Sequence, residues 1–201
     1  MTTTDESTVV VADDHRSRLL SAMARAVAAK GFALVTIADI VAEAGVSRRT
    51  FYEHFPTKAE CLIGLYERAS AQGVQVLAAA LDPALPWHRQ VDQVLAAYLA
   101  WLAGNPVLLR TMFIDILGLG PDGLAARRRA HNALAGFILA TLHAGRHTRP
   151  MDIPPHAALA LVGGVHELVL DRLEAGDADG IRQLAPVAGQ LARRLLTEGG
   201  T

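Results

Sequence analysis

Cationic and hydrogen-bonding side chains gather in a short stretch near the front of the chain. Arg48 and Arg49 are adjacent, and arginine is the side chain that most often reads the acceptors of guanine in the major groove. Hydroxyl, phenol, imidazole and ammonium groups nearby are suited to phosphate oxygens. The candidate DNA contacts are Thr36, Ser47, Arg48, Arg49, Thr50, Tyr52, His54 and Lys58. This chemistry predicts binding to double-stranded DNA.

Two short helices joined by a tight turn are needed to position these side chains. Before the turn, apolar residues recur with helical spacing at Ile37, Ile40, Val41 and Ala44. Thr36, with Asp39 three residues later, is typical of a capping box at a helix start. Gly45 follows the last apolar position, where a left-handed backbone ends a helix at least cost.

The second helix is predicted between Ser47 and Pro56. Ser47 is a favourable N-cap, and proline cannot continue a helix. Phe51 and Phe55 are one helical turn apart and should both face the core. Helical geometry then turns the following side chains outward or to the flanks: Arg48, Arg49, Thr50, Tyr52, Glu53 and His54. The amino-terminal end of such a helix is the part that reaches base edges.

The stretch from Thr36 to Leu62 resembles the DNA-binding domain of the TetR family of bacterial transcriptional regulators. The family's pattern is matched at Thr36, Ile40, Ala44, Gly45, Val46, Ser47, Thr50, Tyr52, His54, Phe55, Lys58 and Leu62, and upstream at Lys30 to Phe32. Two positions depart from it. Val41 replaces the usual alanine, and Arg49 stands where glycine is common. Arg49 adds a long cation to the reading surface, so operator preference cannot be transferred from relatives with glycine.

The resemblance implies a ligand-responsive regulator, by family default a repressor, that binds a pseudo-palindromic operator as a homodimer. In such regulators a small molecule is held among the helices behind the DNA-binding domain, and the last two helices form the dimer. An alternative of a different class is an all-α small-molecule-binding protein without a functional operator. The sequence contains no glycine-rich phosphate loop, HExxH motif or GxSxG motif, so nothing in it favours an enzyme. We expect no cofactor and no metal site.

Composition bounds these interpretations. The 201 residues are 51% hydrophobic and carry a formal net charge of −1, so any field that attracts DNA must come from local placement of charge. Cys61 is the single cysteine, which excludes an intrachain disulfide. The acidic start is not a signal peptide, and no apolar run approaches the ~18 residues of a membrane span. We therefore expect a cytoplasmic protein without a membrane partner.

The whole chain is predicted to be all-α, because glycine and proline cut it into helix-length pieces and alternating β-branched runs are absent. About nine helices are expected. We predict a disordered tail over residues 1–13, a helix-turn-helix DNA-binding domain over 14–62, and a ligand-binding and dimerisation domain over 63–201. A long helix from about residue 57 to 81 is expected to join the two domains.

The back half carries more apolar surface than one helix face needs, over residues 156–175 and 181–196. A second subunit would bury this surface as a four-helix interface, and the alternative is a two-sided core within one chain. The candidate interface residues are Leu159, Val162, Gly163, His166, Leu184, Leu191 and Leu195. The resemblance favours the dimer.

Aromatic and methionine side chains in the central helices are candidates for a ligand pocket: Tyr98, Trp101, Met112, Phe113, Phe137 and His166. Such a stripe at helical spacing is more often ordinary core, and the idea of a pocket depends on the resemblance. The apolar walls and few polar anchors would suit a hydrophobic or aromatic effector.

Overall fold

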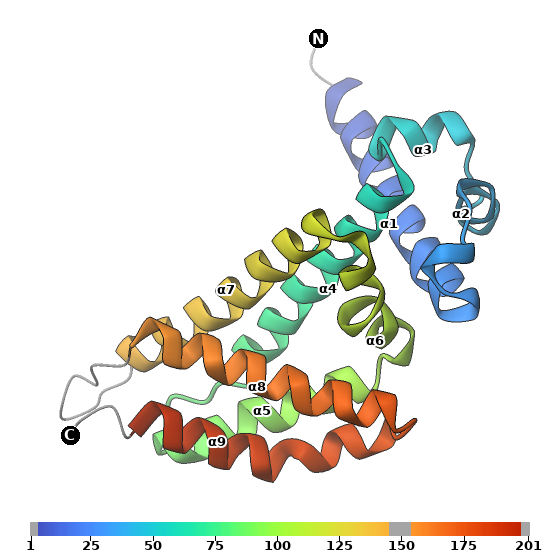
Figure 1. Ribbon diagram of the computed structural model, residues 1–201. Helices are drawn as coiled ribbons and strands as arrows, with labels where there is room; N and C mark the ends of the chain where they lie inside the picture. The colour runs from blue at the N-terminus through green and yellow to red at the C-terminus, as the bar shows by residue number, and fades with distance from the viewer. Residues whose placement is uncertain (1–3, 145–153, 198–201) are drawn as a thin grey trace. The chain divides into compact units, whose positions relative to one another are not determined.

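The computed structural model describes residues 4–144 and 154–197. These residues form nine α-helices with three short 3-10 helices and no strand, as the all-α prediction required (Figure 1). The α-helices are α1 (Thr4–Lys30), α2 (Ile37–Ala44), α3 (Arg48–His54), α4 (Lys58–Ala79), α5 (Trp87–Ala103), α6 (Pro106–Phe113), α7 (Pro121–Ala144), α8 (Pro155–Glu174) and α9 (Ala185–Thr197). The 3-10 helices are η1 (Phe32–Leu34), η2 (Asp115–Leu119) and η3 (Asp179–Leu184).

Helix α1 differs from the prediction of a tail over residues 1–13, because it already begins at Thr4. One sequence feature favours helix there: neither glycine nor proline interrupts residues 4–30. The helix therefore extends well ahead of Asp14, where we expected it to start.

Contacts within the chain divide it into two compact units. The first comprises Met1–Ala69 with Val107–Leu124, and the second comprises Ser70–Pro106 with Ala125–Thr201. The division thus falls within α4 rather than at residue 62. The segment 107–124, which we had placed in the back domain, packs with the first unit.

The first unit is built on the apolar face of α1. Its core contains Leu19, Leu20, Ala22, Met23, Ala24 and Val27 from α1, Val35, Ile40, Ala44, Phe51 and Phe55 from the following elements, and Cys61, Leu62 and Leu65 from α4. Cys61 is fully buried, and burial raises the pKa of its thiol to about 12. Its side chain therefore acts as a small apolar group.

The segment 107–124 is attached to the first unit by polar and apolar contacts. Asp115 Oδ1 accepts a hydrogen bond from the backbone N–H of Phe32 at 3.3 Å, and its carboxylate pairs with Arg110 at 3.2 Å. The Arg110 guanidinium lies against Gly31, where an added Cβ would come within 2.9 Å of it. Leu108 and Leu119 pack against the core of the unit.

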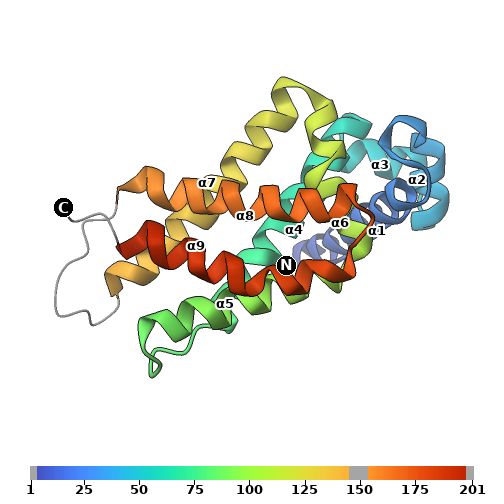
Figure 2. The same ribbon diagram turned by 60° about the horizontal axis from the view of Figure 1, so that its bottom comes forward.

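The second unit is a bundle in which α8 and α9 lie side by side and α9 also packs on α5 (Figure 2). Its buried apolar residues include Leu95, Leu99, Leu102, Leu134, Leu161, Val165, Val169, Ile181, Leu184 and Leu196. Within the described residues, no single helix is both long and apolar enough to cross a membrane.

Candidate functional site

The turn between α2 and α3 is fixed by its caps. Thr36 Oγ1 accepts from the Asp39 N–H at 3.2 Å, and Asp39 Oδ2 accepts from the Thr36 N–H at 2.7 Å, so the predicted capping box is confirmed. Lys30 donates to the same carboxylate at 2.7 Å; this bond, with those from Thr36, holds the pKa of Asp39 well below its usual range. Gly45 ends α2 with a φ of 62°, a left-handed conformation that favours glycine.

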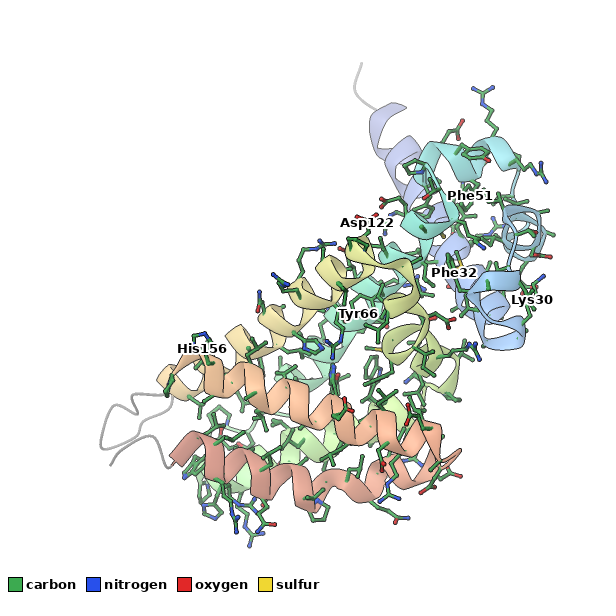
Figure 3. All side chains as sticks on the ribbon, in the orientation of Figure 1. Lys30, Phe32, Phe51, Tyr66, Asp122 and His156 are labelled. Carbon is green, nitrogen blue, oxygen red and sulfur yellow. The ribbon has the colours of Figure 1, made fainter. Side chains whose placement is uncertain are left out.

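Helix α3 begins at a serine cap and is anchored by two phenylalanines. Ser47 Oγ accepts from the Thr50 N–H at 3.0 Å and lies 2.9 Å from Thr50 Oγ1. Phe51 (Figure 3) and Phe55 are both buried, as predicted. Their ring centroids lie 5.9 Å apart. The Thr50 hydroxyl is thus held at the amino-terminal end of the helix.

The opposite face of α3 is open to solvent. Arg48 is exposed, and the side chain of Arg49 is 90% exposed with Nε 3.1 Å from the Glu53 carboxylate. Tyr52 is 57% exposed, although a buried aromatic ring would be the usual case. Arginines and a tyrosine therefore project from one short, capped helix, which is the geometry of a major-groove reader.

His54 is less accessible than expected. Its ring is half-buried and lies 6.5 Å from the ring of His15 on α1. Burial, followed by the nearby His15, lowers the pKa of His54. At neutral pH His54 therefore offers a neutral imidazole rather than a cation to a phosphate.

Lys58 is predicted to contact the DNA backbone, but its ammonium already has partners within the protein. Nζ instead donates to the carbonyls of Phe32 at 3.0 Å and Val35 at 2.7 Å, and it lies 4.3 Å from the centre of the Phe32 ring. The ammonium caps the end of η1 and ties α4 to the segment before α2. The ammonium therefore donates to carbonyls of its own chain.

Replacing Lys58 with methionine should therefore lower stability rather than phosphate binding. Methionine keeps the apolar stem but removes the donor to two carbonyls, and we expect the free energy of unfolding to fall by about 1–3 kcal/mol. Urea unfolding measures this loss, and titration with DNA at several salt concentrations measures the phosphate contacts. If the variant keeps wild-type stability, and the slope of its log binding constant against log salt concentration falls by about one, then Lys58 does contact a phosphate.

Arg18 on α1 is a further residue of this site that the sequence did not single out. Its Nη2 donates to the carbonyls of Ala44 at 2.5 Å and Gly45 at 3.0 Å, the last carbonyls before the turn. Arg25, two turns later on α1, pairs with Glu43 at 2.6 Å. The carboxyl-terminal end of α2 is thus held to α1. No sequence signal distinguishes these arginines from solvated ones, because their acceptors lie on another helix.

Comparison with known proteins agrees with this geometry. Residues 19–65, from α1 into α4, match the sequence profile described as "Bacterial regulatory proteins, tetR family". These residues form a DNA-binding domain of the TetR family. The chain is 31% identical over 100 residues to the nucleoid occlusion factor SlmA of Vibrio vulnificus, a match that covers 49% of this chain and 51% of that protein. The chain spans about half the length of the SlmA relatives it matches.

Solved structures share the TetR-family fold over most of the chain. The fatty acid degradation regulator FadR from Bacillus halodurans superposes with a TM-score of 0.73 at 17% identity, covering 92% of this chain and 96% of that one. FadR from Bacillus subtilis, solved in complex with stearoyl-CoA, gives 0.72 at 16% identity over 90% and 97%. The multidrug binding protein EbrR, solved with imidazole, gives 0.64 at 22% identity over 94% and 95%. At these identities the likeness concerns the fold.

In the second unit of the chain, three of the predicted pocket residues come together. Tyr98 Oη lies 2.9 Å from His166 Nε2, and the Trp101 ring stacks on Tyr98 with centroids 6.0 Å apart. His131 on α7 joins them, with Nε2 3.0 Å from His166 Nδ1. Nothing in the sequence singled out His131, which lies two residues after a run of three arginines and showed no sign of facing inward.

The remaining predicted pocket residues are placed differently. Phe137 is half-buried on α7 of the second unit. Met112 and Phe113 are buried, but they lie in the segment 107–124 and so belong to the first unit. Helical spacing predicted that these side chains would be buried, but not against which elements.

The two buried histidines are neutral at physiological pH. Burial, followed by the positive charge of Arg127, lowers the pKa of His131 to about 4. Burial, followed by His131 and Arg127, lowers the pKa of His166 to about 3. The second unit thus contains two groups that take up protons far more readily after unfolding.

Acid should accordingly destabilise the second unit. Below about pH 6.5 the unfolded chain binds more protons than the folded one, so the free energy of unfolding is greatest above this pH and falls as the pH drops toward about 4. The slope is at most about 1.4 kcal/mol per pH unit for each histidine. Urea unfolding between about pH 7 and pH 5 checks it, and His166→Gln should flatten the profile. Equal wild-type stability across this range would contradict the prediction.

The predicted dimer residues divide into two groups. Leu159 is 37% exposed, an added Cβ at Gly163 would meet no atom within 4 Å, and Leu191 and Leu195 are half-buried. In contrast, Val162, His166 and Leu184 are buried within the chain itself and cannot form an outer surface. Val187 on α9, 45% exposed, was missed. The buried residues correspond to the core that we had considered as the alternative.

Proposed function

We propose that this TetR-family regulator is a ligand-responsive transcriptional repressor that binds a pseudo-palindromic operator as a homodimer in the cytoplasm. The observation that carries the proposal is the outer face of α3, where Arg48, Arg49 and Tyr52 are exposed on a helix fixed by caps and buried phenylalanines. Such a face enters the major groove with its amino-terminal residues at the base edges.

Within this proposal the residues divide the work by chemistry. Arg48 and Arg49 each read a guanine, whereas Thr50, Tyr52 and Ser47 contact phosphate oxygens near the helix start. Thr36 and His54 are weaker candidates, because the Thr36 hydroxyl is held in the capping box and His54 is half-buried. Arg49 must leave or share its pairing with Glu53 to reach a base, a modest cost for an exposed ion pair.

Homodimerisation through α8 and α9 is part of the same proposal. Apolar positions on both helices that are exposed or only half-buried support it: Leu159, Gly163, Val187, Leu191 and Leu195. An isologous contact of these helices would place two α3 helices on one operator. Half-sites are then expected one or two helical turns of DNA apart.

Release from DNA is proposed to follow binding of a hydrophobic small molecule in the second unit. The FadR and EbrR structures that share this fold are described as a complex with stearoyl-CoA and as a multidrug binding protein. The ligand can act only by binding more tightly to the state that does not bind DNA, and such coupling is typically about 1–3 kcal/mol. Operator DNA must then weaken ligand binding by the same factor.

Selection from a pool of random duplexes tests the DNA-binding half directly. We expect purified protein to enrich an inverted repeat, bound at nanomolar concentration and far more tightly than a scrambled duplex. The competing function is an all-α small-molecule-binding protein without a functional operator. Failure to enrich any sequence at low salt would favour that competitor and overturn the repressor.

A further inference from the structure

A line of buried polar side chains crosses the interior of the second unit, and DNA binding does not explain it. It runs from Tyr98 on α5 through His166 on α8 to His131 on α7, with successive polar atoms 2.9 and 3.0 Å apart. Trp101 stacks on Tyr98, and a Cβ added at Gly73 on α4 would come within 3.0 Å of the Tyr98 ring. Packing from α4 and α5 thus holds the tyrosine end in place.

The hydrogen atoms along this line can take only two arrangements, because a neutral imidazole has one N–H and one acceptor nitrogen. In the first, His131 carries its proton on Nδ1, its Nε2 accepts from His166, and His166 Nε2 accepts from the Tyr98 hydroxyl. In the second, every donor and acceptor along the line is exchanged. A group bound at the His131 end therefore determines whether Tyr98 donates or accepts.

The His131 end has an unused polar atom. The side chain is only 6% exposed, and Nδ1 has no hydrogen-bond partner among residues 4–144 and 154–197. The neighbouring positions on α7 are apolar and buried, at Ala130, Leu134 and Ala135.

Arg127 supplies positive charge at the same place. It lies four residues before His131, and such residues neighbour each other on a helix face. Its side chain is half-exposed and forms no ion pair within the described part of the chain. Arg127 is also the cationic side chain whose charge acts on both His131 and His166. A guanidinium, an imidazole nitrogen without a protein partner among the described residues and apolar neighbours together suit an oxyanion attached to an apolar body.

We propose that Arg127 and His131 Nδ1–H bind the carboxylate of an otherwise apolar small molecule, and that this contact sets the proton arrangement as far as Tyr98. The inference rests on the proposed function, since it names the chemical class of the effector. The simpler explanation is that the three polar side chains only fix the register of α5, α7 and α8. That explanation gives Arg127 no role.

Calorimetry on the full-length protein, without DNA, tests the site with octanoate and 1-octanol as matched probes. Octanoate is expected to bind about tenfold to a hundredfold more tightly, the range for a charge-assisted hydrogen bond. Arg127→Gln should remove this preference. Arg128→Gln, the exposed neighbour on the same helix, should keep it. In ¹⁵N spectra of the imidazoles, octanoate should place the His131 proton on Nδ1.

Several outcomes would overturn the proposal: equal affinity for both probes, binding of neither, equal behaviour of the two arginine variants, or acetate and inorganic phosphate binding as tightly as octanoate. Unfolding midpoints equal to wild type show that the variants fold. Titration with operator DNA distinguishes failure of the carboxylate site from failure of the proposed repressor function. If octanoate binds as expected but does not reduce the affinity for operator DNA, the carboxylate site stands. The ligand-responsive part of the proposed function would then be wrong.

Discussion

Gly163→Glu is expected to turn the dimer into monomers and to reduce operator affinity by about 10²–10⁴-fold. Once one α3 helix of a dimer is bound, the second α3 helix binds DNA at a high effective concentration. A monomer loses this advantage, and its operator affinity falls accordingly. An added side chain at Gly163 meets no atom of its own chain within 4 Å, so the protomer can accommodate glutamate. In a dimer the charge would be buried in the apolar contact of α8 and α9 without a partner.

Sedimentation at micromolar concentration and fluorescence anisotropy with operator DNA measure the two effects. Ala96→Glu adds the same charge at an exposed position on α5 and should change neither. Thermal unfolding near the wild-type midpoint would show that the Gly163 variant keeps its fold. A wild-type protein that sediments as a monomer, or a monomeric variant with unchanged operator affinity, would overturn the dimeric reader.

Replacing Arg48 and Arg49 together with alanine is expected to abolish the preference for operator over scrambled DNA. Each bidentate contact with guanine contributes about 1–3 kcal/mol of discrimination, so independent contacts would together contribute about 2–6 kcal/mol. Each single variant should relax the preference at one base pair of each half-site. Because both side chains are exposed, their loss should leave the free energy of unfolding within about 0.5 kcal/mol of wild type.

Anisotropy titrations with matched and scrambled duplexes measure this preference. Glu53→Gln provides a control, since it releases Arg49 from its ion pair and should preserve or strengthen binding. If Arg49→Ala keeps wild-type affinity and base preference, the arginine does not read a base and Arg48 alone carries the discrimination. If the double variant keeps both, α3 is not the reading helix.

The first unit could be predicted in detail because its signals are local. The capping box at Thr36 and Asp39, the left-handed Gly45 and the pair Phe51 and Phe55 all lie within a few residues of what they control. Local spacing fixes helix ends and the face that turns inward. Those features, and the all-α class, followed from the sequence.

What the sequence did not reveal depends on partners from distant elements. The carbonyls that hold Lys58 lie 26 and 23 residues away, and His131 meets a histidine 35 residues along the chain. Periodicity also predicted that Met112 and Phe113 would be buried without showing that they join the first unit. A hydrophobic pattern indicates which face is covered, but only the fold determines what covers it.

The assignment of 107–124 to the first unit has a consequence for protein engineering. The polypeptide passes between the units three times, after Ala69, after Pro106 and after Leu124. A DNA-binding fragment cut at residue 62 or 69 would lack Arg110 and Asp115 and would uncover the backbone of Phe32 and the apolar surface under Leu119. A hybrid regulator that exchanges DNA-binding units should therefore transfer the segment 107–124 together with residues 1–69. The transferred unit then consists of two pieces of chain rather than one amino-terminal block.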